Sequence, residues 1–444
     1  MTDARLALFG GTPTVDRIAH RRWPIVGDAE RDAVLGVLER GVLSGASAPE
    51  SVAFEQEFGR FVEAKHALLT HSGTSALHLA LAAAGVRAGD HVIVPAYSFV
   101  ATPLAVLHCG AIPIFADVDD ATGLIDPADV ARRVGSRTRA VMPVHVHGCA
   151  LDLDPLLALG RDRGLAIIED AAQAHGARWR GRAVGAIGTA GGFSLQSSKN
   201  LGVGEGGVFV TNDDALAEEA VRMRSFGQEV TLADRDAFDA MRPLDASRAV
   251  ASRRVGWMYR GTELASALGR SMLARLPERT AACQANAELL SRALGELAGV
   301  LPPTIPPGST SVHHKYRVRL DPARAGVDIP RRVFRDVVAQ ALRAEGLEVV
   351  AWQTDPLPAQ PVFREREGFG NGWPWTQDRE TDFDAAYDPS TFPATQRLLD
   401  GSVVLFSQSC PLIAQERGMV VRYAEAFARI WKHREELCAR AARG

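Results

Sequence analysis

Between residues 29 and 212, the chain repeatedly passes from helical periodicity into a short apolar run that ends at or near Pro or Asp. The runs have the length of strands and cover residues 91–95, 112–117, 140–144 and 165–170. Near-continuous apolar runs are typical of strands buried on both faces, as in parallel sheets covered by helices. This pattern predicts an α/β fold with a mostly parallel central sheet and a binding crevice at the carboxyl ends of its strands.

The length of 444 residues predicts more than one domain. We expect an N-terminal arm at 1–28, a large domain at 29–282 and a smaller C-terminal α+β domain at 283–444, where Pro-rich punctuation replaces the earlier rhythm. Within the small domain, residues 364–396 are rich in Trp, Phe, Asp, Gly and Pro and lack periodicity. They predict a long loop that is either a lid over a binding site, carrying Phe369, Trp373, Trp375 and Tyr387, or a partner contact.

Composition excludes several classes of protein. Hydrophobic residues make up 46% and charged residues 23%, which is typical of a folded soluble protein. The formal net charge is -3 without a basic stripe, so no nucleic-acid partner is expected. The five cysteines are widely spaced and form no CxxC pair, which predicts reduced thiols in the cytoplasm and no metal site. The N-terminus does not resemble a signal peptide, and no apolar run is long enough to span a membrane.

The segment 72–77, Ser-Gly-Thr-Ser-Ala-Leu, places a glycine and small hydroxyl residues just ahead of a helix expected at 74–84. Free backbone N–H groups and the positive end of the helix dipole favour a phosphate at such a position. The alternative is an ordinary capped helix start, because Ser and Thr are common N-caps. This segment alone does not decide between the two.

Asp170 and Lys199 make the phosphate interpretation more specific. Asp170 ends an apolar strand, so its carboxylate is expected at the mouth of the sheet, where it would keep a pyridine nitrogen protonated. Lys199 lies among hydroxyl residues and glycines before another apolar strand, which is an unusual setting for a surface lysine. A partly desolvated lysine forms a Schiff base with an aldehyde cofactor. Ser194 offers a further phosphate contact.

These residues resemble the DegT/StrS-type aminotransferases, which adopt the fold type I arrangement of the aspartate aminotransferase superfamily. The resemblance covers nearly the whole chain. It rests on segments that occur in the family's order, namely 73–77, 95–102 (Pro-Ala-Tyr-Ser-Phe-Val-Ala-Thr), 143–148 (Pro-Val-His-Val-His-Gly), 169–176 (Glu-Asp-Ala-Ala-Gln-Ala-His-Gly), the Lys199 segment, 204–207 (Gly-Glu-Gly-Gly) and 256–260 (Gly-Trp-Met-Tyr-Arg) with Glu263.

The resemblance implies pyridoxal 5'-phosphate (PLP) as the cofactor and assigns residues to it. Lys199 is implied to be both the anchor and the proton shuttle, and Asp170 the partner of the ring nitrogen. Phe99 is implied to stack on the ring, Gln173 to lie beside it, and Ser194 to contact the phosphate. The segment Gly73, Thr74 and Ser75 is implied to complete the phosphate site.

The implied reaction is a two-stage amino transfer from glutamine or glutamate to a cyclic ketone. The segments 8–13 and 22–24 resemble the keto-cyclitol branch, which serves aminoglycoside-like biosynthesis, more than the branch that acts on nucleotide-linked keto-sugars. Lys199 excludes the family's dehydratases, in which histidine replaces lysine. An aromatising enzyme of the aminohydroxybenzoate type stays open, and a non-catalytic regulatory homologue is disfavoured because Asp170, Gln173 and Lys199 are all present.

Further implications concern the substrate pocket and the assembly. His147 stands where the family often has an aromatic residue, and His313 and His314 precede a strand expected at 315–320. All three are candidates for substrate contacts, although a satisfied structural histidine is a common alternative. The family's active sites lie between two subunits, so the resemblance also implies a homodimer.

One position departs from the family's pattern. Met258 stands where many relatives have an asparagine whose amide reaches the cofactor phosphate of the neighbouring subunit, and a thioether cannot donate that hydrogen bond. Three explanations stay open: a nearby cation such as Arg253 or Arg254 substitutes for the amide, cofactor affinity is weaker, or the loop is rearranged.

If a cation compensates, Arg254→Ala weakens cofactor binding, because the phosphate loses a charge-assisted partner. A titration of cofactor-free protein with the cofactor measures this directly. An affinity equal to that of the unsubstituted protein would contradict the compensation.

Overall fold

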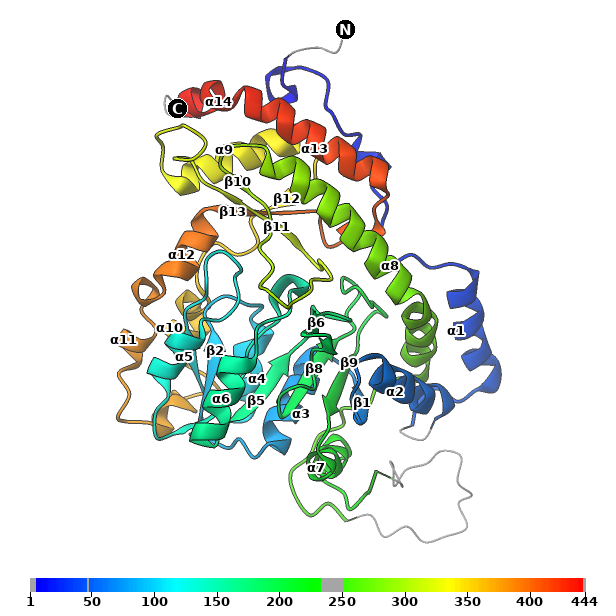
Figure 1. Ribbon diagram of the computed structural model, residues 1–444. Coiled ribbons are helices and arrows are strands. Elements are labelled where there is room, and N and C mark those ends of the chain that lie inside the picture. Colours follow the sequence, from blue (N-terminus) through cyan, green and yellow to red (C-terminus); the bar gives the residue numbers. More distant parts are fainter. Residues whose placement is uncertain (1–4, 46–47, 233–250, 442–444) are drawn as a thin grey trace.

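The computed structural model describes residues 5–45, 48–232 and 251–441 (Figure 1). Its largest element is a seven-stranded sheet. In spatial order the strands are β1 (His66–Thr70), β9 (Gly207–Thr211), β8 (Ala190–Ser194), β5 (Ala166–Asp170), β4 (Thr138–Val141), β2 (His91–Pro95) and β3 (Ile112–Ala116). Only β9 runs against its neighbours. The predicted α/β fold with a mostly parallel sheet is confirmed, and each of the four apolar runs contributes a strand.

Helices pack against this sheet because their sequences are apolar where they face it. The helix predicted at 74–84 is α3 (Gly73–Ala83), and its residues from Ser75 to Leu81 are all buried. The other helices of this part of the chain are α1 (Asp28–Arg40), α2 (Pro49–Phe61), α4 (Ala101–His108), α5 (Pro127–Arg133), α6 (Asp154–Arg163) and α7 (Asp214–Arg224). A helix that is apolar on all sides belongs in the interior, which explains why α3 lies between the sheet and helices α4 and α7.

A second, antiparallel sheet lies at the other end of the molecule (Figure 1). Its strands in spatial order are β10 (Val300–Leu301), β11 (Tyr316–Leu320), β13 (Ser402–Leu405) and β12 (Val349–Val350). Helices α9 (Arg331–Ala344), α13 (Arg417–Lys432) and α14 (Arg434–Ala441) cover it. Helix α9 is amphipathic: Phe334, Val338, Ala341 and Leu342 recur at helical spacing and are buried.

Helix α8 (Glu263–Gly295) connects the two sheets (Figure 1). Its first part packs against α1 and α2, and it also contacts α13. The domain boundary expected near residue 283 therefore falls inside one continuous helix of 33 residues. The helix does not end at this position, so it belongs to both of the parts that the sequence predicts as separate domains.

The N-terminal arm lies against the small sheet and its helices. The buried Glu345 side chain accepts hydrogen bonds from the backbone N–H of Ala7 at 2.9 Å and from Thr14 Oγ1 at 2.6 Å. Arg429 of α13 forms an ion pair with the same carboxylate at 3.1 Å. These contacts hold the arm in place before it turns toward the large sheet at residue 23.

The segment 364–396, for which the sequence predicts a long loop, is irregular between short helices and lies against the large sheet. It contains the short helices η5 (Trp375–Gln377), α11 (Phe383–Ala386) and η6 (Pro389–Thr391) and the start of α12 (Pro393–Asp400). Tyr387 donates a hydrogen bond to the carbonyl of Pro113 on β3 at 2.6 Å, and its ring lies 5.3 Å from that of Phe115. The segment covers the edge strand β3 of the large sheet, which would otherwise expose unpaired backbone groups.

We predict that Tyr387→Phe destabilises the protein. The buried hydroxyl also accepts a hydrogen bond from Trp375 Nε1 at 3.0 Å, so its removal leaves a donor and an acceptor unpaired. Each orphaned buried group costs about 1–3 kcal/mol. Urea denaturation measures the loss, with Phe369→Leu at an exposed position as the control. An unchanged midpoint for Tyr387→Phe would show that the segment does not depend on this contact.

Candidate active site

A cavity of about 360 Å³ opens at the carboxyl ends of β5 and β8, between the large sheet and the start of β11. Eight of the residues singled out in the sequence line it: Gly73, Thr74, Phe99, Asp170, Gln173, Ser194, Lys199 and His314. Three others do not: Ser75, His147 and His313. Residues from five separate segments thus meet in one cavity, as the strand ends predict.

The phosphate-like corner is built on the first turn of α3. Ser72 caps the helix, because its Oγ accepts a hydrogen bond from the backbone N–H of Ser75 at 3.1 Å. The Ser75 hydroxyl lies 2.7 Å from the Ser72 hydroxyl and 2.9 Å from His71 Nδ1, and it does not line the cavity. Ser75 therefore supports the cap, while Gly73 and Thr74 face the cavity.

Gly73 sets the width of this corner. A Cβ atom at position 73 would lie 2.6 Å from the Cβ of Ser194, so only glycine lets the helix start approach β8 this closely. The approach places the free N–H groups of α3 beside the Ser194 hydroxyl, at one end of the cavity. This arrangement fits a phosphate group.

Asp170 lies buried at the end of β5. Its Oδ2 accepts a hydrogen bond from Thr102 Oγ1 at 2.7 Å, and its Oδ1 accepts one from the backbone N–H of Ala172 at 3.1 Å. Burial raises the pKa of this carboxyl, while the two hydrogen bonds and the charge of Lys199 act in the opposite direction. The carboxyl group is thus held in one orientation, in a place where a protonated ring nitrogen would pair with it.

Lys199 lies in the loop after β8. Burial lowers the pKa of its ammonium group to about 8, although the negative charge of Asp170 opposes the shift. The backbone N–H of Lys199 donates to the carbonyl of Gln196 at 2.8 Å, and the Lys199 carbonyl accepts a hydrogen bond from Trp23 Nε1 at 2.8 Å. A depressed pKa in a cavity is typical of a lysine that acts as a nucleophile.

The wall behind the cavity contains His147. The Gln173 side chain accepts a hydrogen bond from the His147 backbone N–H at 2.7 Å, and the His147 ring lies 2.7 Å from the hydroxyl of Tyr97. His147 therefore supports Gln173 and does not reach the cavity. His314 faces the cavity with Nδ1 3.4 Å from Asn200 Oδ1, whereas His313 faces the opposite side of the wall.

Four site residues were not singled out in the sequence: Trp23, Thr102, Lys315 and Trp352. Thr102 lies in the segment 95–102 and Trp23 in the segment 22–24, both of which carry the family resemblance. Lys315 begins the strand predicted at 315–320. Their contacts join positions that are far apart in the chain, such as Trp23 with Lys199. No local pattern signals such pairs.

Phe99 and Met258 are exposed large apolar side chains, with 54% and 47% of their surface accessible. Phe99 lines the cavity and Met258 does not. Arg253 pairs with Glu229, and Arg254 pairs with Glu219, so both guanidinium groups have carboxylate partners within this chain. The cavity lining includes no residue of 364–396, so the expectation that this segment forms a lid over the chain's own site is wrong.

Other kinds of site receive no support from the described ranges. Within residues 5–45, 48–232 and 251–441, no group of three or more His, Cys, Asp or Glu side chains is placed to hold a metal ion. In the same ranges, no helix combines the length and the apolar character needed to cross a membrane.

We predict that Asp170→Asn lowers the pKa of Lys199 below 8 in the cofactor-free protein. Burial alone lowers this pKa, and the carboxylate partly offsets it, so loss of the carboxylate leaves burial unopposed. The rate at which an amine-directed reagent labels Lys199, followed by peptide mass spectrometry against pH, gives the midpoint. Glu205→Gln, which also removes a carboxylate from the cavity lining, is the control. A midpoint that stays constant or rises in Asp170→Asn would refute the coupling.

Comparisons with known proteins agree with this geometry. Residues 24–381 match the DegT/DnrJ/EryC1/StrS aminotransferase family. A putative L-glutamine:3-amino-2,3-dideoxy-scyllo-inosose aminotransferase of Streptoalloteichus tenebrarius is 35% identical over 385 residues, which is 85% of this chain and 87% of that protein. The 3-amino-5-hydroxybenzoate synthase of Amycolatopsis mediterranei is 38% identical over 282 residues, covering 63% of this chain and 69% of the synthase.

Solved structures show the same fold. The crystal structure of 3-amino-5-hydroxybenzoic acid synthase has a TM-score of 0.77 at 30% identity and covers 93% of this chain and 100% of its own. DesV of S. venezuelae, solved with a ketimine intermediate, has a TM-score of 0.74 at 29% identity and covers 93% and 98%. With its partly buried lysine, its aspartate and its phosphate-like corner in one cavity, the chain belongs to the DegT/DnrJ/EryC1/StrS family and is a PLP-dependent aminotransferase of fold type I.

Proposed function

We propose that this enzyme moves an amino group from glutamine or glutamate to a keto-cyclitol in an aminoglycoside-like biosynthesis. The observation that carries transamination is that Lys199 and Asp170 line the same cavity, which Gly73 and Ser194 close at one end. The relative named for L-glutamine and a scyllo-inosose supports the donor and the class of acceptor. A ketone on a nucleotide-linked sugar is the related alternative for the acceptor.

In this proposal, the residues of the cavity hold PLP, which would supply an electron sink when it is bound. Thr74, Ser194 and the N–H groups at the start of α3 would hold its phosphate. Asp170 would accept a hydrogen bond from the protonated ring nitrogen, and Gln173 and Phe99 would contact the ring. The orientation of Asp170 depends on Thr102, because that hydroxyl occupies one of its two oxygens.

Lys199 is the group that moves protons. With a pKa of about 8, roughly a tenth of the amine is neutral at pH 7, against far less for an exposed lysine. The neutral amine would be the nucleophile that anchors the cofactor. When it is free, its Nζ would take a proton from the carbon of the amino donor and would later return one to the ring carbon of the acceptor.

We also propose a homodimer with twofold symmetry. Phe99 at the cavity and Met258 outside it are exposed in the single chain, and large exposed apolar side chains are typical of surfaces that a partner covers. A second copy placed over this face would close the site from the solvent.

An aromatising synthase is the second candidate. The relative at 38% identity and the solved structure at 30% identity carry the name of 3-amino-5-hydroxybenzoate synthase, and such an enzyme keeps the lysine. The two candidates differ in their product, because aromatisation yields a ring with strong ultraviolet absorbance and transamination of a cyclitol does not.

The test separates the two stages of the reaction. Glutamine, glutamate and alanine are added in turn to the holoenzyme without acceptor, and we expect glutamine to abolish the visible absorbance of the bound cofactor. Keto-cyclitols and nucleotide-linked keto-sugars are then added, and the absorbance is expected to return with a keto-cyclitol. Lys199→Met, which should show no conversion at a catalytic rate, is the control.

If no amino donor converts the cofactor, transamination is excluded. A different outcome is that an amino donor converts the cofactor but the only acceptor to yield a product is a cyclic keto acid. If that product absorbs as an aromatic ring, the enzyme is an aromatising synthase and not a cyclitol aminotransferase.

A further inference from the structure

Lysine is scarce in this chain, and half of its lysines line the same cavity. The sequence has four, Lys65, Lys199, Lys315 and Lys432, although Lys and Arg together number 50. Lys199 and Lys315 both face the cofactor cavity. A compact ammonium group at position 315 therefore stands out in a chain that uses arginine for nearly all of its positive charge.

Lys315 has no carboxylate partner among the described residues. Its Nζ lies 5.6 Å from the centre of the Trp352 ring, which is a cation–π contact. Partial burial, followed by the charge of Lys199, lowers its pKa to about 8. A partly desolvated ammonium group without a counter-ion favours a negative charge nearby.

Arg317 is a second cationic side chain without a carboxylate partner. It lies two residues after Lys315, so both side chains point to the same side of the extended chain at the start of β11. Arg317 is only 5% exposed, and both its Nε and its Nη1 lack a hydrogen-bond partner. Its guanidinium group lies 6.0 Å from the centre of the Tyr97 ring. The negative charge of Asp119 acts on the pKa of this guanidinium, but the two side chains do not form an ion pair. A guanidinium group is always charged, so these buried N–H donors favour a hydrogen-bond acceptor beside them.

Lys315 and Arg317 meet in a small cleft behind the cofactor cavity. The cleft has a volume of about 20 Å³, and Lys315 lines both spaces. A space of this size admits only a compact occupant. His147 also faces the cleft with an unpaired Nδ1, and no carboxylate side chain belongs to its lining.

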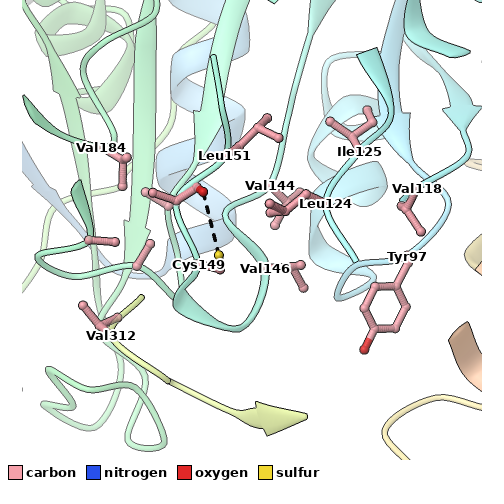
Figure 2. Packing of buried hydrophobic residues seen from close by; sticks show 14 of the residues in the cluster. Tyr97, Val118, Leu124, Ile125, Val144, Val146, Cys149, Leu151, Val184 and Val312 are labelled. Atoms are coloured by element: carbon pink, nitrogen blue, oxygen red, sulfur yellow. Dashed lines mark hydrogen bonds between the residues drawn. The ribbon is translucent and has the colours of Figure 1, made fainter. Parts of the chain in front are cut away.

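The apolar side of the cleft comes from Val146 and Cys149. Figure 2 shows both among the residues of the buried cluster, with Val146 drawn between Cys149 and Tyr97. Apolar walls with unpaired donors at the base favour an anion that accepts hydrogen bonds, since such walls strengthen an electrostatic contact.

We propose that Lys315 and Arg317 form a binding site for a compact monovalent anion, a carboxylate group or a halide, in the wall between the cofactor cavity and the rear cleft. Arg317 donates from Nε and Nη1, and Lys315 adds its charge from the cavity side. The anion comes either from solution or from the carboxylate of the amino donor. The second source rests on the proposed function, whereas the site itself does not.

The test measures anion binding without turnover. Sodium formate and sodium chloride are titrated into the holoenzyme at constant ionic strength, with sodium methanesulfonate as the balancing salt, and the melting temperature is recorded. We expect a saturable rise with formate or chloride. In Arg317→Met, the apparent affinity should fall by about tenfold or more, because charge-assisted hydrogen bonds are lost.

Two further variants control for general effects of charge. Arg324→Met removes a positive charge just beyond the end of the same strand, but Arg324 does not line the cleft, and its side chain pairs with Asp321. It should retain the saturable response. Lys315→Met should weaken it, and Lys315→Arg should restore most of it. Equal responses in Arg317→Met and the unsubstituted enzyme, or equal responses to methanesulfonate and formate, would overturn the proposal.

Competition identifies the source of the anion. The dissociation constant of glutamine is measured in the donor half-reaction with and without saturating formate. A rise of fivefold or more, on the order expected for competition at a shared charged group, assigns the site to the carboxylate of the donor. An unchanged constant, together with the saturable formate response, assigns it to a free anion. Failure of the half-reaction itself would count against the proposed function and leave the melting measurements intact.

Discussion

The desolvation of Lys199 and Asp170 in one cavity is the constraint on which the rest of the site depends. Moving a charged group out of water costs several kcal/mol unless an opposite charge or hydrogen bonds compensate it. Here the compensation is incomplete, because the pKa of Lys199 falls to about 8 and that of Asp170 rises.

Segments that are distant in the sequence hold Lys199 and Asp170 in their positions. Trp23 of the arm anchors the Lys199 carbonyl, and Thr102 of α4 orients Asp170. The arm is itself fastened to the small sheet through Glu345. The position of the lysine loop thus depends on the small domain as well as on the large sheet, and the shared helix α8 ties the two together.

Much of the fold and part of the site could be predicted because the signals are local. Apolar runs indicate buried strands, and glycine and hydroxyl residues before a helix indicate a corner that fits a phosphate. For the segment 364–396, aromatic residues without periodicity indicate that a surface is covered but do not identify that surface. The sequence also does not place the side chains of His147 and Ser75, because whether a polar side chain faces a cavity or a neighbouring group depends on differences of a few ångströms.

The sequence by itself determined the order of the elements, the α/β class and the identity of the lysine and aspartate, because residue type and spacing along the chain carry that information. Only the tertiary structure decided which groups face one another. Gly73 lies against Ser194, Trp23 reaches Lys199, and Lys315 shares a wall with Arg317. Desolvation and unpaired donors arise from these encounters between remote segments, so the lowered pKa of Lys199 and the buried cationic cleft exist only in the folded chain.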